Sequence, residues 1–243
     1  MMSEARSRKV FCLGWHKTGT STMGCALLEL GFKVVGARLD TVDDLEAGRI
    51  DKVIALAENF DAFQDVPWAA LYQELDVAFP GSKFIFVERD QSKWLKSAAR
   101  HFGSTDFPMH KWLYGNGILI GNEKLYLDRY MQHNVDVKNY FRGRDDFLNF
   151  SLDDGDDWKK LCNFLDKPLP PIPFPYENKG PHSHNVKERV VTLIRSLIPL
   201  ALRRSLFNAR LHIRKRRGLP DPRDRFNNLE ANRNRHTKHR ERN

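Results

Sequence analysis

Short apolar runs alternate with longer amphipathic stretches along most of the chain. The apolar runs, rich in β-branched and aromatic residues, predict strands at residues 9–13, 32–35, 60–66, 84–87 and 147–150. Helix formers or a three-to-four-residue apolar period predict helices at residues 23–30, 41–58, 69–79, 92–102, 123–141 and 158–165. Strands that alternate with helices predict an α/β fold, in which a parallel sheet is covered by helices on both faces.

Two details refine this pattern. Thr41, followed by Asp44 three residues later, predicts a side-chain cap at the start of the second helix. Residues 103–121 combine Gly, Pro and aromatic residues without a clean period. They predict a long loop of the kind that covers a binding site.

Charge divides the chain into two parts. Residues 186–243 contain 17 Lys and Arg against 5 Asp and Glu, whereas residues 1–185 contain 23 against 26. The basic character therefore belongs to the end of the chain, and nucleic-acid binding is not expected of the remainder. We predict an α/β domain at residues 1–185, a basic amphipathic helix at 186–217 and a disordered basic tail at 218–243.

The predicted basic helix has one apolar stripe, made by Val190, Leu193, Ile194, Leu197 and Ala201. Such a stripe either lies on an anionic membrane surface or packs along the α/β domain, and the pattern leaves both alternatives open. The three cysteines form no CxxC pair, and the first nine residues are polar. We therefore expect a cytoplasmic protein, with membrane-peripheral attachment as the alternative that the basic helix allows.

The segment with the clearest chemistry joins the first strand to the first helix and reads Gly14, Trp15, His16, Lys17, Thr18, Gly19, Thr20, Ser21, Thr22. Backbone N–H groups and the helix dipole at such a junction favour an anion. A nucleotide-hydrolysing loop places its lysine after the second glycine, directly before a magnesium-binding Ser or Thr. Here Lys17 precedes Gly19. The order of residues thus indicates a phosphate-binding loop of a different kind.

A second segment carries matching chemistry at the end of the strand at residues 84–87. Arg89 follows that strand, and Ser97 lies eight residues later on the next helix. The guanidinium offers a two-pronged donor to phosphate, and Ser97 brings a hydroxyl two turns into the helix. The structural alternative is a surface ion pair between Arg89 and Asp90, with Asp90 capping the helix.

The order Lys-Thr-Gly-Thr-Ser resembles the 5'-phosphosulfate loop of sulfotransferases that use 3'-phosphoadenosine 5'-phosphosulfate (PAPS). The likeness covers roughly residues 9–178 and is greatest to the short branch of bacteria, fungi and invertebrates. It implies a P-loop-type α/β sheet and transfer of a sulfuryl group without a required metal. It also implies that Lys17 contacts the bridging oxygen. Implied ligands of PAPS are Lys17, Thr18, Gly19, Thr20 and Ser21 at the 5' end, and Arg89, Ser97, Lys179 and Gly180 at the 3'-phosphate.

A hydroxyl acceptor also needs a base, which in the resembling family is a histidine or a carboxylate. Asp65, after the third predicted strand, is the best placed carboxylate. Heparan-type enzymes have a glutamate one position earlier, where this chain has Gln64, so the register is open. The structural alternative is that Asp65 caps the helix after Pro67. His16 and His101 are reserve candidates, each with surface or core packing as its alternative. The acceptor itself, whether a small molecule, a glycan or a lipid, is not encoded in these motifs.

Two other functions remain as alternatives. One is a P-loop nucleotide or small-molecule kinase, which would show Gly-Lys-Ser/Thr in sequence and bind magnesium. The other is a basic protein that binds RNA or membranes through Arg203, Arg204 and residues 214–217, with a non-catalytic P-loop domain.

Overall fold

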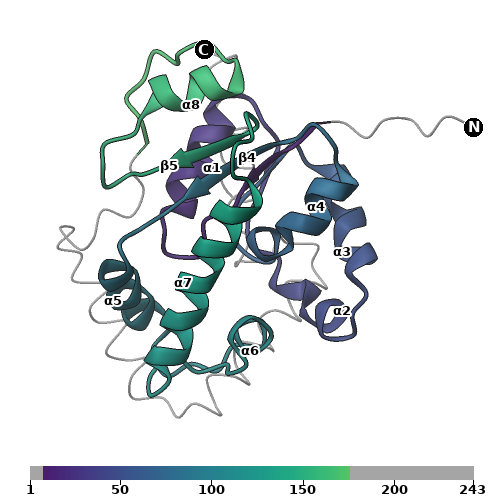
Figure 1. Ribbon diagram of the computed structural model, residues 1–243, viewed down its shortest axis with the longest axis vertical. Helices are drawn as coiled ribbons and strands as arrows, with labels where there is room; N and C mark the ends of the chain where they lie inside the picture. Colours follow the sequence, from purple (N-terminus) through teal and green to yellow (C-terminus); the bar gives the residue numbers. More distant parts are fainter. Residues whose placement is uncertain (1–7, 176–243) are drawn as a thin grey trace, which may run out of the picture. The chain divides into compact units, whose positions relative to one another are not determined.

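The computed structural model describes residues 8–175, which contain a five-stranded sheet (Figure 1). The strands are β1 (Val10–Cys12), β2 (Val34–Val35), β3 (Ala62–Phe63), β4 (Lys83–Val87) and β5 (Phe147–Phe150), in the spatial order β2-β3-β1-β4-β5. Every neighbouring pair is parallel. The predicted α/β fold is confirmed, and β1 lies at the centre of the sheet.

Eight α-helices connect and cover these strands. They are α1 (Thr20–Glu29), α2 (Val42–Glu46), α3 (Ile50–Leu56), α4 (Tyr72–Ala78), α5 (Gln91–Phe102), α6 (Pro108–Tyr114), α7 (Glu123–Tyr140) and α8 (Trp158–Leu165) in the described range. Short 3-10 turns are η1 (Leu39–Thr41), η2 (Ala57–Asn59) and η3 (Trp68–Leu71).

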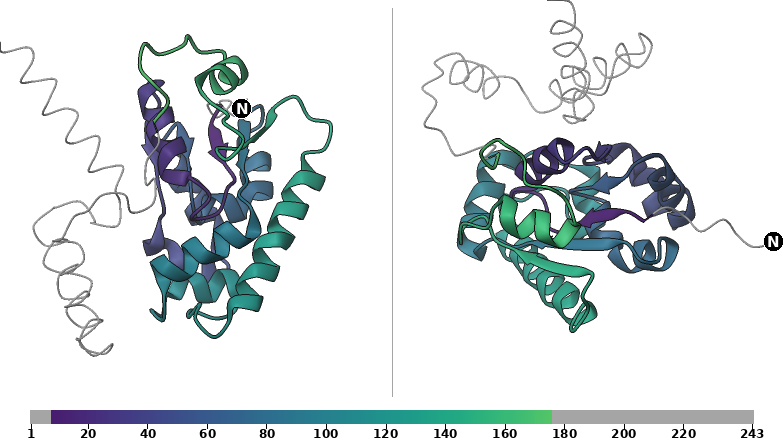
Figure 2. Two further views of the ribbon diagram at one scale, coloured as in Figure 1. Left: turned by 90° about the vertical axis from the view of Figure 1, so that its left-hand side faces the viewer. Right: turned by 90° about the horizontal axis from the view of Figure 1, so that it is seen from above.

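Alternate residues of the strands point to two hydrophobic clusters, one on each face of the sheet. Phe11 and Leu13 join the cluster that α2 to α7 cover, whereas Val10 and Cys12 join the cluster under α1 and α8. Figure 2 (left) shows α1 and α7 on opposite sides of the strands. This two-residue alternation explains why the strands read as continuous apolar runs: both faces are buried.

Three local predictions were wrong. The helix expected at residues 41–58 is two helices, because Gly48 takes a left-handed φ of 69° between α2 and α3. Thr41 does not cap α2 with its side chain: its hydroxyl donates to the Arg38 carbonyl at 2.6 Å. The expected loop at 103–121 contains α6, which Pro108 begins and which ends at Gly115 with a φ of 79°.

Residues 176–243 lie outside the described part of the chain. The predicted helix at 186–217, the tail at 218–243 and the ligands Lys179 and Gly180 therefore stay predictions. Within residues 8–175, no helix has the length and apolar character that a bilayer-spanning segment requires.

Candidate functional site

The site is built from three loops that leave the same edge of the sheet. Since β1 pairs in parallel with β3 on one side and with β4 on the other, their carboxyl ends lie together. The loops that follow carry Lys17, Asp65 and Arg89 respectively. The fold thus brings together three residues that are far apart in sequence.

The first loop, residues 13–19, is called the β1–α1 loop here. Its turn is closed by Thr18, whose N–H and hydroxyl both donate to the Trp15 carbonyl, at 3.2 and 2.7 Å. Lys17 and Gly19, on either side of Thr18, have positive φ of 69° and 107°. Gly19 caps α1, so the first N–H groups of the helix have no partner within the helix. Backbone donors and the helix dipole make this loop suited to an anion.

The β1–α1 loop packs closely against β4. A Cβ atom at Gly14 would lie 2.5 Å from the Val87 carbonyl oxygen and 2.5 Å from the Thr18 hydroxyl. Only glycine fits there. The loop therefore takes its shape from the centre of the sheet.

Arg89 connects the end of β4 to this loop. Its Nη1 donates to the Lys17 carbonyl at 2.8 Å. Its own backbone is held by the Tyr130 hydroxyl on α7, which donates to the Arg89 carbonyl at 2.7 Å and lies 3.2 Å from the Arg89 nitrogen. Asp90 instead caps α5 by accepting from the Lys93 nitrogen at 3.0 Å. Arg89 is thus directed to the β1–α1 loop rather than into an ion pair with Asp90.

Ser97 lies on the second turn of α5 and is partly exposed. The structure therefore places it on the helix that Asp90 begins, as the sequence predicts. Its part in holding a 3'-phosphate stays a prediction.

Asp65 is bound to the beginning of α1. One carboxylate oxygen, Oδ2, accepts from the Thr20 hydroxyl at 3.1 Å, and the other, Oδ1, accepts from the Val66 N–H at 2.8 Å. Its side chain caps neither η3 nor α4, so the capping alternative is excluded. Burial raises the pKa of Asp65 above its ordinary value of 3.8, against the opposing effects of the two hydrogen bonds and of the Lys17 charge.

Gln64, at the competing register position, is buried, and its Oε1 is one of two buried side-chain polar atoms without a partner in the described range. The other is Trp15 Nε1. Asp65 is partly exposed and is the carboxylate in contact with α1. Of the two registers, geometry therefore favours Asp65.

The two histidines lie in different surroundings. His16 is buried, with its Nε2 2.6 Å from the Tyr114 hydroxyl, and its carbonyl accepts from Trp94 Nε1 at 2.9 Å. Burial is the main reason that its pKa is held well below 6.5. His101 is exposed near the end of α5. Of the three candidate bases, Asp65 is bonded to α1 through the Thr20 hydroxyl.

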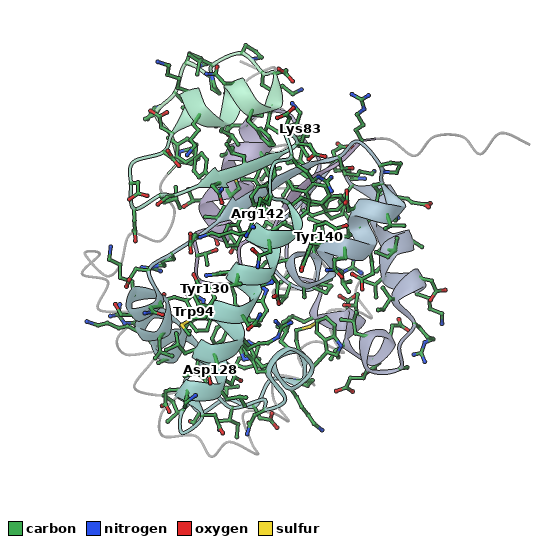
Figure 3. The ribbon with its side chains drawn as sticks, viewed as in Figure 1. Lys83, Trp94, Asp128, Tyr130, Tyr140 and Arg142 are labelled. Atoms are coloured by element: carbon green, nitrogen blue, oxygen red, sulfur yellow. The ribbon has the colours of Figure 1, made fainter. Side chains whose placement is uncertain are left out.

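Side chains from α5 and α7 support the loops, and the sequence motifs did not reveal them. Trp94 stacks on Tyr130 with ring centroids 4.2 Å apart, and both are labelled in Figure 3. This pair fixes the residue that holds Arg89. Tyr126 and Tyr130 are four residues apart on α7, a spacing that indicates a shared face but names no partner.

No group of three or more His, Cys, Asp and Glu within residues 8–175 is arranged to hold a metal ion.

Comparison with known proteins agrees with this geometry. The chain matches the sulfotransferase domain family over residues 9–116 and 104–183. It is also similar to Ava biosynthesis cluster protein M of Aspergillus versicolor, with 24% identity over 213 residues, covering 69% of this chain and 80% of that protein. The family match extends over most of the chain and includes all three loops of the site. The chain therefore belongs to the sulfotransferase domain family.

Proposed function

We propose that this protein transfers a sulfuryl group from PAPS to a hydroxyl acceptor and releases 3',5'-ADP. The observation that carries the proposal is a pair of hydrogen bonds that connect the three loops. Arg89 donates to the Lys17 carbonyl, and Asp65 accepts from the Thr20 hydroxyl. A lysine, a guanidinium and a carboxylate thus surround the N-terminus of one helix.

The donor would lie along the β1–α1 loop. The N–H groups at the start of α1, those of Thr20 and Ser21 among them, and the Ser21 hydroxyl are suited to the 5'-phosphosulfate. Arg89 uses one of its donors on the Lys17 carbonyl, and its other guanidinium donors are available for the 3'-phosphate. Lys179 and Gly180, outside the described residues, remain proposed partners of the same phosphate.

The reaction would proceed as a direct transfer. The acceptor oxygen attacks sulfur while the bond from sulfur to the bridging oxygen breaks, and the electron pair stays on the 5'-phosphate of the leaving 3',5'-ADP. Lys17 stabilises the charge on that oxygen, and Asp65 takes the hydroxyl proton. Such a charge-spread transition state is favoured by positioning and positive charge.

Calorimetry on the full chain tests the donor. We expect 3',5'-ADP to bind without magnesium, and ATP with magnesium to bind more weakly. Transfer is then followed by mass spectrometry of 3',5'-ADP released from PAPS in the presence of phenols and alcohols. Magnesium-dependent ATP binding, together with no affinity for 3',5'-ADP, would overturn the proposal in favour of a kinase.

A further inference from the structure

Arg129 is a cation next to the β1–α1 loop that the proposed reaction does not use. It lies on α7 between Asp128 and Tyr130, which are labelled in Figure 3. Its guanidinium carbon is 5.2 Å from the ring centre of Trp15, and Trp15 is fully buried two residues before Lys17. The guanidinium is therefore held over the face of an aromatic residue of the β1–α1 loop.

No acidic side chain within residues 8–175 forms an ion pair with Arg129. Asp136, further along α7, accepts from Gln132 Nε2 at 2.7 Å, and Asp128 binds Lys124. Asp65 is engaged by Thr20 and Val66. A guanidinium has five donors and no acceptor, and a partly buried one is normally matched by an anion. Here the described chain supplies no such match.

The other groups around Trp15 are neutral. His133, one turn beyond Arg129, stacks on Trp15 at 4.7 Å and donates Nε2–H to the Leu13 carbonyl at 2.9 Å. Burial lowers the pKa of His133 to about 4, so it is uncharged at neutral pH. Tyr114 packs edge-on against Trp15 at 5.2 Å, and Trp15 Nε1 is itself a donor without a partner. Within residues 8–175, no carboxylate thus forms an ion pair with Arg129, and Trp15 Nε1 has no acceptor.

Tyr114 also links Arg129 to the proposed base. Burial is the main cause of the raised pKa of the Tyr114 phenol; the Asp65 charge raises this pKa further, and the Arg129 charge lowers it. The Trp15 ring contacts both the Arg129 guanidinium and Tyr114, and it belongs to the same loop as Lys17.

We propose that Arg129 is a specificity-determining residue that binds a carboxylate of the acceptor, so that the preferred acceptors are hydroxylated carboxylates. This inference rests on the proposed sulfuryl transfer: the acceptor hydroxyl faces Asp65, and its carboxylate faces Arg129. A planar carboxylate matches the fork of a guanidinium.

The test uses matched acceptors, 3-(4-hydroxyphenyl)propanoate and its carboxamide. With the full chain we expect kcat/KM to favour the carboxylate by about tenfold or more, as for one charge-assisted pair. Arg129→Gln should remove this preference, mainly through KM. Arg129→Lys should retain part of it. Arg100→Gln, which removes an exposed cation from α5, should leave the preference intact.

Binding of the same two compounds, measured by calorimetry on the full chain with and without 3',5'-ADP, gives a readout that does not depend on turnover. Tighter binding of the carboxylate to the parent but not to Arg129→Gln would support the proposal. Equal binding of both compounds to the parent, or an unchanged preference in Arg129→Gln, would overturn it. If 3',5'-ADP itself does not bind, the proposed function fails, and the carboxylate comparison still decides the role of Arg129.

Discussion

Lys17 and Asp65, the two residues proposed for catalysis, both have positive φ, 69° and 71°. A residue with a Cβ atom is rarely left-handed, and holding it there costs on the order of 1–3 kcal/mol unless the surroundings compensate. Here the Arg89 bond to Lys17 and the Thr20 and Val66 bonds to Asp65 provide that compensation. The strain lies where the proposed chemistry takes place.

Lys17→Ala should lower kcat by about 100-fold or more, because it removes the charge that stabilises the leaving oxygen. The side chain is only partly buried, so the thermal midpoint should stay close to that of the parent. Lys17→Arg keeps the charge and serves as the matched control. Steady-state rates with PAPS decide the matter, and a Lys17→Ala enzyme within a few-fold of the parent would refute this role.

Asp65→Asn should reduce turnover by a factor of about 100 to 10,000, because the amide cannot take a proton. Asn tolerates the left-handed backbone and can still accept from Thr20 or Val66, so affinity for 3',5'-ADP should not change. If turnover survives, the base is another group, and His16 and His101 are the next to be exchanged.

The pH profile tests the same carboxyl group. The basic form is active and burial raises the pKa of Asp65, so kcat/KM should be lost as pH falls through a pKa higher than 3.8. The rates are measured against pH in the parent and in Asp65→Asn. The acid limb should disappear in the variant; an unchanged limb would assign it to another group.

Among the structural elements, the β4–α5 turn contacts the β1–α1 loop through Arg89. Arg89→Ala should lower the affinity for 3',5'-ADP by about tenfold or more, because this nucleotide carries a 3'-phosphate. The affinity for adenosine 5'-phosphosulfate, which has no 3'-phosphate, should fall much less. Lys93→Gln, which removes a neighbouring exposed cation, is the control. Calorimetric titration of both nucleotides separates the roles: an equal loss would mean that Arg89 only supports the loop.

The contact between the β1–α1 loop and β4 has its own test. Gly14→Ala should lower the free energy of unfolding by about 3 kcal/mol, because the new methyl group meets a backbone carbonyl. A methyl group at Gly48 would meet no neighbouring atom, so Gly48→Ala should lower the free energy of unfolding by about 1 kcal/mol, through the positive φ alone. Urea unfolding of both variants compares them, and equal costs would mean that the loop moves away freely.

Sequence patterns predicted all five strands and most helices, because strands buried on both faces are apolar throughout and helices of ten or more residues show their period. The break between α2 and α3 at Gly48 and the short helix α6 were not predicted. Both depend on backbone φ angles and tertiary contacts, which the hydrophobic period of the sequence does not contain. Lys17, Asp65 and Arg89 were predicted as site residues because they follow strands and, for Lys17 and Arg89, because of the family resemblance; their roles stay predictions. Arg129 and Tyr130 were not, because a mid-helix residue acquires its partner only when the helix docks.

At the scale of the whole molecule, the excess of positive charge lies in residues 186–243, beyond the described residues. We expect the full chain to sediment with anionic vesicles at low salt, since polybasic residues contribute roughly 1 kcal/mol each near such a surface. A version that ends at residue 185 should stay in the supernatant. If neither sediments and the truncated chain unfolds, the predicted helix at 186–217 belongs to the domain instead, and the membrane proposal fails.

The hydrogen bond from Trp94 to the His16 carbonyl, and the position of Trp15 within the same loop, couple two indoles to the anion-binding segment. Their intrinsic fluorescence should therefore change when an anion binds to this loop. Excitation near 295 nm would follow ligand arrival on the millisecond timescale in a stopped-flow instrument, without any attached dye. Trp94→Phe would remove the hydrogen-bonded indole, so that its share of the signal can be separated from that of the four other tryptophans.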